Sequence, residues 1–118
     1  MSYPKRGEIY LVNLPGQPGD MKARPALIVS MDIRNRLAND VVVVPISTTL
    51  RSSPTHIQFA KGEGGHYKLS SAKCEQITTL DKCFLVRGLF SGTVKAETMA
   101  EVEKAIQTAV RIINGISF

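Results

Sequence analysis

Three short apolar segments constrain the fold of this chain more than any other feature. They are Arg24–Ser30 (Arg-Pro-Ala-Leu-Ile-Val-Ser), Val42–Thr49 (Val-Val-Val-Pro-Ile-Ser-Thr-Thr) and Cys74–Lys82 (Cys-Glu-Gln-Ile-Thr-Thr-Leu-Asp-Lys). Short runs rich in apolar and β-branched residues predict buried β-strands. Pro25 fits the first position of a strand, where its missing N–H is tolerated, and it holds the preceding Arg24 in extended geometry. The sequence therefore predicts a β-sheet whose strands begin or end in polar side chains.

The remaining segments extend this pattern to a mainly β chain. We expect strands over Gly7–Leu14, Pro25–Met31, Val41–Ile46, Thr55–Phe59, Ser70–Ile77 and Phe84–Phe90, and a helix over Lys95–Ile113 that Gly115 stops. The apolar side chains of that helix recur as one face, namely Met99, Val102, Ile106, Ala109, Val110 and Ile113. The polar stretch Asp32–Asp40 predicts no element. Short strands and glycine-bearing turns indicate a small, strongly curved antiparallel sheet or barrel with a C-terminal helix, in one domain over residues 1–118.

The chain is basic, and its excess positive charge is unevenly distributed. Fifteen Lys and Arg residues against ten Asp and Glu residues give a formal net charge of +5. The stretch Lys95–Phe118 is neutral overall, so the whole excess lies before it. A basic rim favours nucleic acid or an acidic protein as partner, although a mildly basic solvated surface would give the same count.

Composition also bears on the compartment. No apolar run approaches the roughly 18 residues that span a bilayer, and Met1–Lys5 lacks the apolar core of a signal peptide. Cys74 and Cys83 have no paired Cys or His at metal-ligand spacing. We therefore expect a cytoplasmic protein with reduced thiols, no membrane partner, no metal and no cofactor.

The strand ends carry groups that suit a phosphodiester. Arg24 offers a planar fork of five donors that can hold a phosphate and stabilise the charge of its transition state. Ser47 and Thr48 offer hydroxyls, although hydroxyls at strand ends also commonly bond the backbone. Glu75 could accept a proton or form a salt bridge, and Gln76 could contact a base or a ribose.

Together with the opening Arg6–Tyr10, these segments resemble the MazF/PemK family of toxin endoribonucleases. The resemblance runs from about Lys5 to the last helix, and the Arg-Pro strand and the Glu75–Lys82 segment are its specific parts. It implies the SH3-like barrel shared by MazF, PemK and CcdB-like toxins. It also implies a sequence-specific endoribonuclease that cuts single-stranded RNA without a metal, through the 2′-hydroxyl, leaving 2′,3′-cyclic phosphate and 5′-hydroxyl ends. The implied partners are a second copy in a homodimer, an acidic antitoxin and, only through that antitoxin, operator DNA.

The resemblance assigns roles to residues by position. Arg24 matches the catalytic arginine, and the catalytic hydroxyl, usually Thr in the family, falls on Ser47, with Thr48 as the alternative. The predicted RNA-binding residues are Lys22, Arg51, His66, Glu75, Gln76 and Thr78, while Asp81 is expected only to cap its turn. His56 and His66 are the two histidines, and His66, in a glycine-rich loop, is the better candidate for acid–base chemistry. Asp20 and Lys22 before Arg24 differ from the acidic residue of many relatives, which puts the recognised RNA sequence in question.

Two other functions compete. A gyrase-poisoning toxin of the same fold would act through a C-terminal Trp-Gly-Ile, whereas this chain has Asn114-Gly115-Ile116 and no tryptophan. A catalytically degenerate member that only binds nucleic acid is disfavoured by Arg24 but kept open by the Ser47 substitution.

Overall fold

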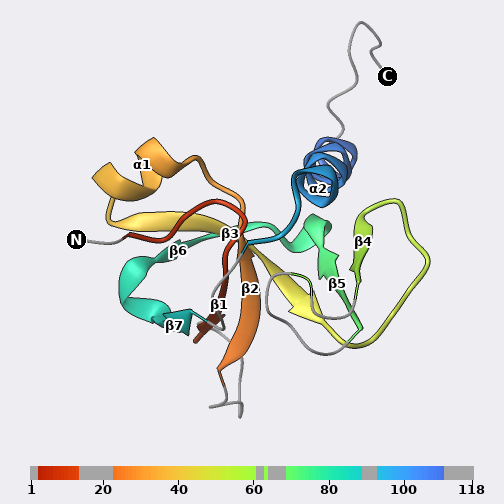
Figure 1. Cartoon of the computed structure of the whole chain (residues 1–118), viewed down its shortest axis with the longest axis horizontal. Helices are drawn as coiled ribbons and strands as arrows, with labels where there is room; N and C mark the ends of the chain where they lie inside the picture. The colour runs from red at the N-terminus through yellow and green to blue at the C-terminus, as the bar shows by residue number, and fades with distance from the viewer. Residues whose placement is uncertain (1–2, 14–22, 61–62, 64–68, 89–92, 111–118) are drawn as a thin grey trace, which may run out of the picture.

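The fold is an antiparallel sheet that curls around a long central strand and carries one long helix (Figure 1). The structure is a computed structural model that describes residues 3–13, 23–60, 63, 69–88 and 93–110. Its strands are β1 (Ile9–Val12), β2 (Arg24–Ile28), β3 (Asp40–Ser47), β4 (His56–Phe59), β5 (Ser70–Lys73), β6 (Thr78–Asp81) and β7 (Leu85–Gly88). The helices are α1 (Asp32–Leu37) and α2 (Ala96–Ala109), with 3-10 turns η2 (Cys74–Gln76) and η3 (Lys82–Phe84). The predicted mainly β architecture with a C-terminal helix is confirmed.

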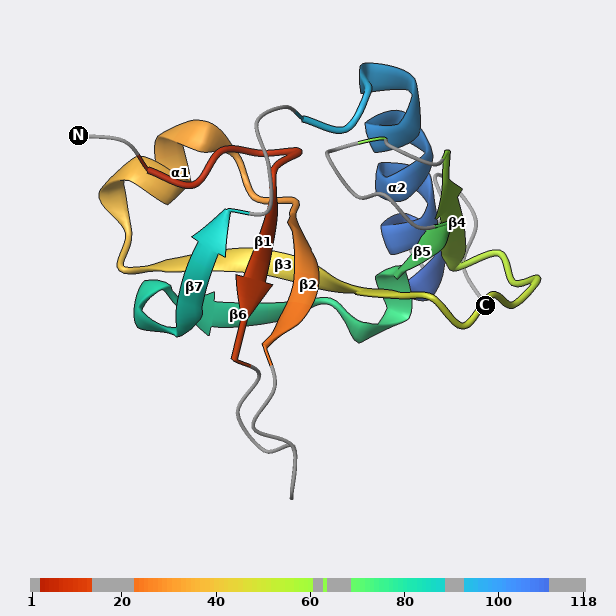
Figure 2. The ribbon, with the colours of Figure 1, turned by 60° about the horizontal axis from the view of Figure 1, so that its bottom comes forward.

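The central strand β3 organises the sheet. The strand order is β4-β5-β3-β2-β1-β7, and β6 also pairs with β3. Strands β5 and β6 follow each other along one edge of β3, where Ser47 pairs with Ser71 and Val43 pairs with Thr78. Figure 2 shows β3 running through the molecule, with β1, β2 and β7 crossing it on one side and β4 and β5 lying near its far end.

A bulge separates β5 from β6, and it places polar residues at the surface. Between the pairs Ile46–Ala72 and Val43–Thr78, β3 has two residues, whereas the facing segment has five. The surplus forms η2, in which Cys74 is buried and Glu75 and Gln76 are exposed. Pro45 lies at this level of β3 and has no N–H to donate, so the facing backbone loses little by leaving the ladder. One predicted strand, Ser70–Ile77, is therefore wrong in its second half.

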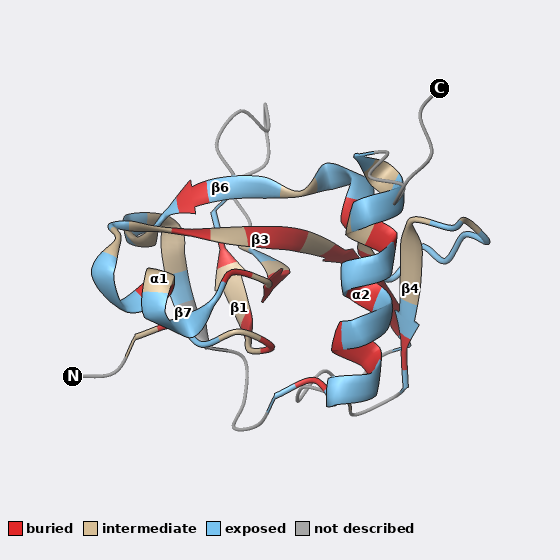
Figure 3. Cartoon of the chain, turned by 90° about the horizontal axis from the view of Figure 1, so that it is seen from above, coloured by how far each residue is buried: buried red, intermediate tan, exposed pale blue. Residues whose placement is uncertain are grey.

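Two apolar clusters fill the two faces of the sheet. The first joins Leu27, Val44, Ile46, Phe59 and Ala72 to α2, and the second joins Val12, Ala26, Ile28, Val41, Val43 and Leu80. Helix α2 buries Met99, Val102 and Ala105, the red stripe that faces the sheet in Figure 3. The predicted helical face is thus correct for Met99 and Val102, but Val110 is exposed and Ala105 replaces it in the core. Ile113 and Gly115 lie outside the described residues.

Several predicted boundaries are corrected by local contacts. Gly7 has a φ of 92°, a left-handed conformation that suits glycine, and strand β1 begins only at Ile9. Strand β2 ends at Ile28, before the predicted Met31. Asp81 accepts a hydrogen bond from the Cys83 N–H at 2.9 Å, which confirms its capping role and turns the chain into η3 before β7. Strand β7 therefore starts at Leu85, one residue later than predicted.

The largest correction is α1, which occupies a stretch predicted to have no element. Asn35 is fully buried, although it lies in a polar segment. Its Nδ2 donates to the Ser30 carbonyl at 3.0 Å, its Oδ1 accepts from the Ser30 hydroxyl, and that hydroxyl accepts the Val42 N–H at 3.0 Å. These bonds tie α1 to β3, so a tertiary network and not an apolar face holds the helix.

This network gives a stability prediction. Asn35→Ala should lower the free energy of unfolding by about 1–3 kcal/mol, because the buried Ser30 groups would lose their partners. Denaturant unfolding measures the change. Asn39→Ala, at an exposed position two residues after α1, is the matched control and should be near neutral. Equal stability of the Asn35 and Asn39 variants would contradict this role.

Candidate nucleic-acid interface and active site

One face of the β3, β5 and β4 strands carries mainly polar side chains. Ser47, Ser71 and Gln58 lie opposite one another across the three strands, and Lys73 pairs with His56 two residues along. Because side chains alternate between the faces of a strand, these residues share one face. The other face presents Ile46, Ala72 and Ile57 to the first apolar cluster with α2. The polar face is therefore the one turned away from α2.

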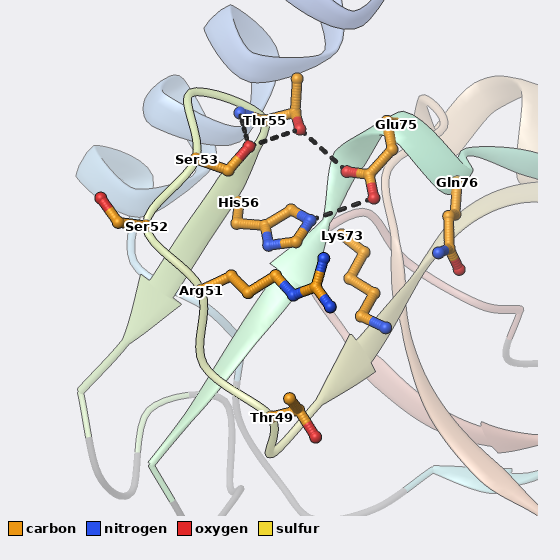
Figure 4. A pocket seen from close by; sticks show the side chains of 9 residues that line it. All are labelled: Thr49, Arg51, Ser52, Ser53, Thr55, His56, Lys73, Glu75 and Gln76. Carbon is orange, nitrogen blue, oxygen red and sulfur yellow. Dashed lines mark hydrogen bonds and ion pairs between the residues drawn. The ribbon is translucent and has the colours of Figure 1, made fainter.

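A pocket of about 640 Å³ opens beside this face (Figure 4). Its volume falls in the range of about 300–1,000 Å³ that is typical of ligand sites. The lining side chains are all polar or charged: Thr49, Arg51, Ser52, Ser53, Thr55, His56, Lys73, Glu75 and Gln76. The loop between β3 and β4, the first residue of β4, strand β5 and the η2 bulge supply them. The pocket brings together three predicted RNA-binding residues, Arg51, Glu75 and Gln76, and adds His56 and Lys73, which the prediction did not include.

Glu75 is held by hydrogen bonds at both of its carboxylate oxygens. The Thr55 hydroxyl donates to Oε1 at 2.9 Å, and His56 Nε2 bonds Oε2 at 3.0 Å. Ser53 lies 3.1 Å from the Thr55 hydroxyl and extends the chain of contacts. No pairing with Lys or Arg is needed to hold Glu75, because its carboxylate bonds the His56 ring instead.

These contacts shift the titration of Glu75. Burial alone would raise its pKa, but the hydrogen bonds from His56, from its own backbone and from Thr55 outweigh burial. The net effect lowers the pKa of Glu75 below its ordinary value of 4.5. Glu75 is therefore a carboxylate at neutral pH, and it acts as a hydrogen-bond acceptor for two neighbours.

A pH dependence of stability follows. A carboxyl group with a lowered pKa stabilises the folded state above its unfolded pKa, and this stabilisation is lost as the pH falls through the folded pKa. The melting temperature of the parent should thus exceed that of Glu75→Gln at pH 7, and the gap should narrow below about pH 4.5. The gap should be modest, because the Glu75 side chain is 39% exposed and screened by water. A gap that does not change with pH would contradict this assignment.

His56 lines the pocket, although the sequence prediction ranked it below His66. Its side chain is only 8% exposed, and its Nδ1 atom is buried without a hydrogen-bond partner among the described residues. The preferred histidine, His66, lies outside the described residues. The sequence of β4 contained a signal for this position. Side chains alternate along a strand, so His56 lies on the same face as the polar Gln58 and away from the apolar Ile57 and Phe59.

Arg24, Ser47 and Thr48 do not line this pocket. Arg24 is the first residue of β2 and is exposed, while Ser47 is the last residue of β3. Ala26 pairs with Pro45, and Arg24 and Ser47 each lie two residues beyond this pair, toward the end of their own strand. Arg24 and Ser47 therefore lie at the same end of two neighbouring antiparallel strands. The Thr49 N–H donates to Ser47 Oγ at 3.0 Å, which orients this hydroxyl and leaves its hydrogen for another acceptor. Thr48 is exposed.

Of the remaining predicted RNA-binding residues, Thr78 lies within the described part of the chain. Thr78 is exposed at the start of β6, opposite Val43. Lys22 lies outside the described residues, as does His66. Within the described ranges, no three His, Cys, Asp or Glu side chains come together as a metal-binding group.

Both cysteines are free in the structure, Cys74 at a buried position and Cys83 at an exposed one. Burial, with the neighbouring Glu75, raises the pKa of Cys74 to about 11, so this thiol is protonated at neutral pH. No helix in the described part of the chain is long and apolar enough to cross a membrane.

Comparison with known proteins gives one consistent family. Residues 5–110 match the family described as PemK-like, MazF-like toxin of type II toxin-antitoxin system. The chain is 34% identical over 110 residues to endoribonuclease MazF1 of Mycobacterium bovis, covering 93% of this chain and 95% of the relative. It is 29% identical over 114 residues to endoribonuclease EndoA of Bacillus subtilis, with 93% and 97% covered.

Solved structures agree with this result. A mycobacterial endoribonuclease in complex with its cognate antitoxin superposes with a TM-score of 0.79 at 33% identity, covering 93% of this chain and 97% of that one. MazF of Deinococcus radiodurans superposes at 0.77 over 95% of this chain and 100% of that one, and at 18% identity it supports the fold alone. The SH3-like barrel expected from the resemblance is confirmed in its barrel-like form, although the sheet is not closed. By sequence and by fold, the chain belongs to the PemK-like, MazF-like family of toxins of type II toxin–antitoxin systems.

Proposed function

We propose that this protein is a sequence-specific endoribonuclease toxin that cuts single-stranded RNA by a metal-independent mechanism. The observation that carries the proposal is the position of Arg24 and Ser47 at the same end of β2 and β3, beside a basic, polar pocket. Family membership supports it, and so do the names of the relatives, which are endoribonucleases. Groups on paired strands are held rigidly, which suits a site that must stabilise a transition state.

The proposed reaction uses the RNA as its own nucleophile. The ribose 2′-oxygen gives up its proton to water and attacks the adjacent phosphorus. The bond from phosphorus to the 5′-oxygen breaks, the leaving oxygen takes up a proton from water, and the products carry a 2′,3′-cyclic phosphate and a 5′-hydroxyl. Arg24 binds the phosphate oxygens and stabilises the added negative charge, and Ser47, with Thr48 as the alternative, donates a hydrogen bond to the leaving oxygen. None of these steps requires a metal, because a guanidinium supplies the positive charge.

The pocket would hold RNA next to the cleaved bond. Arg51 and Lys73 supply positive charge, and Gln76 supplies an amide for a base or ribose. Glu75 acts there chiefly as the acceptor that holds His56 and Thr55. Thr78, Lys22 and His66 remain proposed RNA contacts.

We further propose that the protein acts as a homodimer and is neutralised by an acidic antitoxin. The net charge of +5 favours an acidic partner, and a related endoribonuclease has been solved with its cognate antitoxin. Operator DNA would be reached only through that antitoxin.

The test is cleavage of a long RNA by the purified protein in excess EDTA. We expect cleavage to proceed, with 5′-hydroxyl ends that a polynucleotide kinase labels directly, and a 2′-deoxy substitution at the cut site should block it. Cleavage that EDTA abolishes, or products with 5′-phosphates, would refute the 2′-hydroxyl mechanism. A DNA gyrase supercoiling assay in parallel tests the alternative target, and inhibition of gyrase without RNA cleavage would favour the gyrase-poisoning function.

A further inference from the structure

The buried edge of the His56 ring suits recognition of an RNA base. This inference rests on the proposed endoribonuclease function. The His56 side chain is 8% exposed, and Nε2 bonds Glu75 at 3.0 Å. Glu75 is itself fixed by Thr55 at 2.9 Å, and Thr55 contacts Ser53 at 3.1 Å. Strand β4 and the η2 bulge therefore hold the imidazole ring in one orientation at the wall of the pocket (Figure 4).

The contact with Glu75 determines which ring nitrogen carries the proton. A carboxylate only accepts hydrogen bonds, so the proton between the two groups belongs to His56 Nε2. In the neutral imidazole the other nitrogen, Nδ1, is then a bare acceptor. Nδ1 is buried and has no hydrogen-bond partner among the described residues. A buried acceptor without a donor is unfavourable, and a ligand that supplied an N–H would relieve this cost.

The chemistry of the pocket limits the ligand that can do so. A phosphodiester has no hydrogen to donate and cannot satisfy the bare Nδ1. A nucleobase presents N–H donors next to carbonyl or ring-nitrogen acceptors on the same edge. The charged groups of Arg51 and Lys73 only donate, and both line the pocket with His56. A base edge thus finds an acceptor for its N–H and donors for its adjacent acceptors.

We propose that His56 is a specificity-determining residue of this ribonuclease: its Nδ1 accepts a hydrogen bond from a nucleobase N–H in the pocket, and Glu75 positions the ring for that contact. Arg51 is exposed and lies beside the ring in Figure 4, so a base can reach Nδ1 by displacing a surface side chain. Glu75 is the positioning residue, since it acts on the base only through His56.

The variant that isolates Nδ1 is His56→Gln. The amide nitrogen of glutamine reaches the position of Nε2 and can still donate to Glu75, but it leaves no acceptor at the position of Nδ1. Cleavage sites on a long RNA, mapped by sequencing of 5′ ends, give the base preference at each position of the recognised motif. We expect the parent to show a motif and His56→Gln to lose preference at one position by about 10- to 100-fold, the range for one base contact. Gln107→Ala, at an exposed position on α2 and outside the pocket, is the control and should leave the motif unchanged.

A binding measurement covers variants that do not cut. An uncleavable RNA with the parent motif and a 2′-deoxy cut site is compared with RNAs in which one motif base is N-methylated at its donor. Methylation at one position should weaken binding to the parent and leave binding to His56→Gln unchanged. An unchanged motif in a folded His56→Gln protein would overturn the proposal, as would an equal loss of affinity for all RNAs, which is the signature of a phosphate contact. Cleavage by the parent without any base preference would also overturn it. Absence of RNA cleavage by the parent is instead a failure of the proposed function.

Discussion

Replacing Arg24 by alanine is expected to lower RNA cleavage by about 1,000-fold or more, the range seen when a positive group that stabilises a phosphoryl transition state is lost. Arg24 begins β2 with an extended backbone, and Pro25 keeps it so. Its side chain is exposed, so the substitution should change the free energy of unfolding by only about 0.5 kcal/mol or less. Single-turnover cleavage of a short RNA and denaturant unfolding measure the two effects.

Two variants sharpen the Arg24 test. Arg24→Lys should recover little activity, because an ammonium group cannot make two parallel hydrogen bonds to a phosphate. Arg36→Ala removes the same charge from an exposed position on α1, which follows the opposite end of β2, and it should keep most of the activity. Near-parental cleavage by Arg24→Ala would show that the site lies elsewhere.

Replacing Ser47 by alanine is expected to lower the cleavage rate by about 10- to 1,000-fold with little change in RNA affinity, because the group acts mainly in the transition state. Ser47 ends the rigid strand β3, and the Thr49 N–H at 3.0 Å orients its oxygen. Ser47→Thr should retain or raise activity, because the hydroxyl is kept and because the family resemblance implies Thr at this position. Thr48→Ala should slow the chemical step less, and His56→Ala should slow that step less again, because His56 is proposed to act on base preference.

The hydrogen bond from Thr49 gives Ser47 a structural role that must be separated from catalysis. Loss of that turn contact alone should cost about 1 kcal/mol of stability and should not slow the chemical step of folded protein. Unfolding free energies, RNA binding and single-turnover rates of the same variants make the separation. Near-normal cleavage by Ser47→Ala beside a large loss in His66→Ala would assign the proton transfer to a histidine.

Local patterns in the sequence were sufficient for the strands and for their polar ends. Continuous apolar and β-branched runs and the position of Pro25 predicted β2 and β3, and the same patterns placed Arg24 and Ser47 at strand ends. The spacing of apolar residues predicted α2, and Asp81 was recognised as a cap. These features depend on the backbone period and on contacts between near neighbours in the chain, which a sequence displays directly.

The tertiary structure decided which of these groups meet. Helix α1 is held in place because the buried Asn35 bonds Ser30, which in turn bonds β3. The spacing of apolar residues in the sequence does not predict such a contact. Glu75 reaches His56, 19 residues earlier in the chain, because the η2 bulge forms opposite Pro45 and because β4 pairs with β5 in one register. Register and bulges are set by packing between distant segments, so the sequence alone placed polar residues at strand ends, and only the folded sheet assembled the pocket that holds His56.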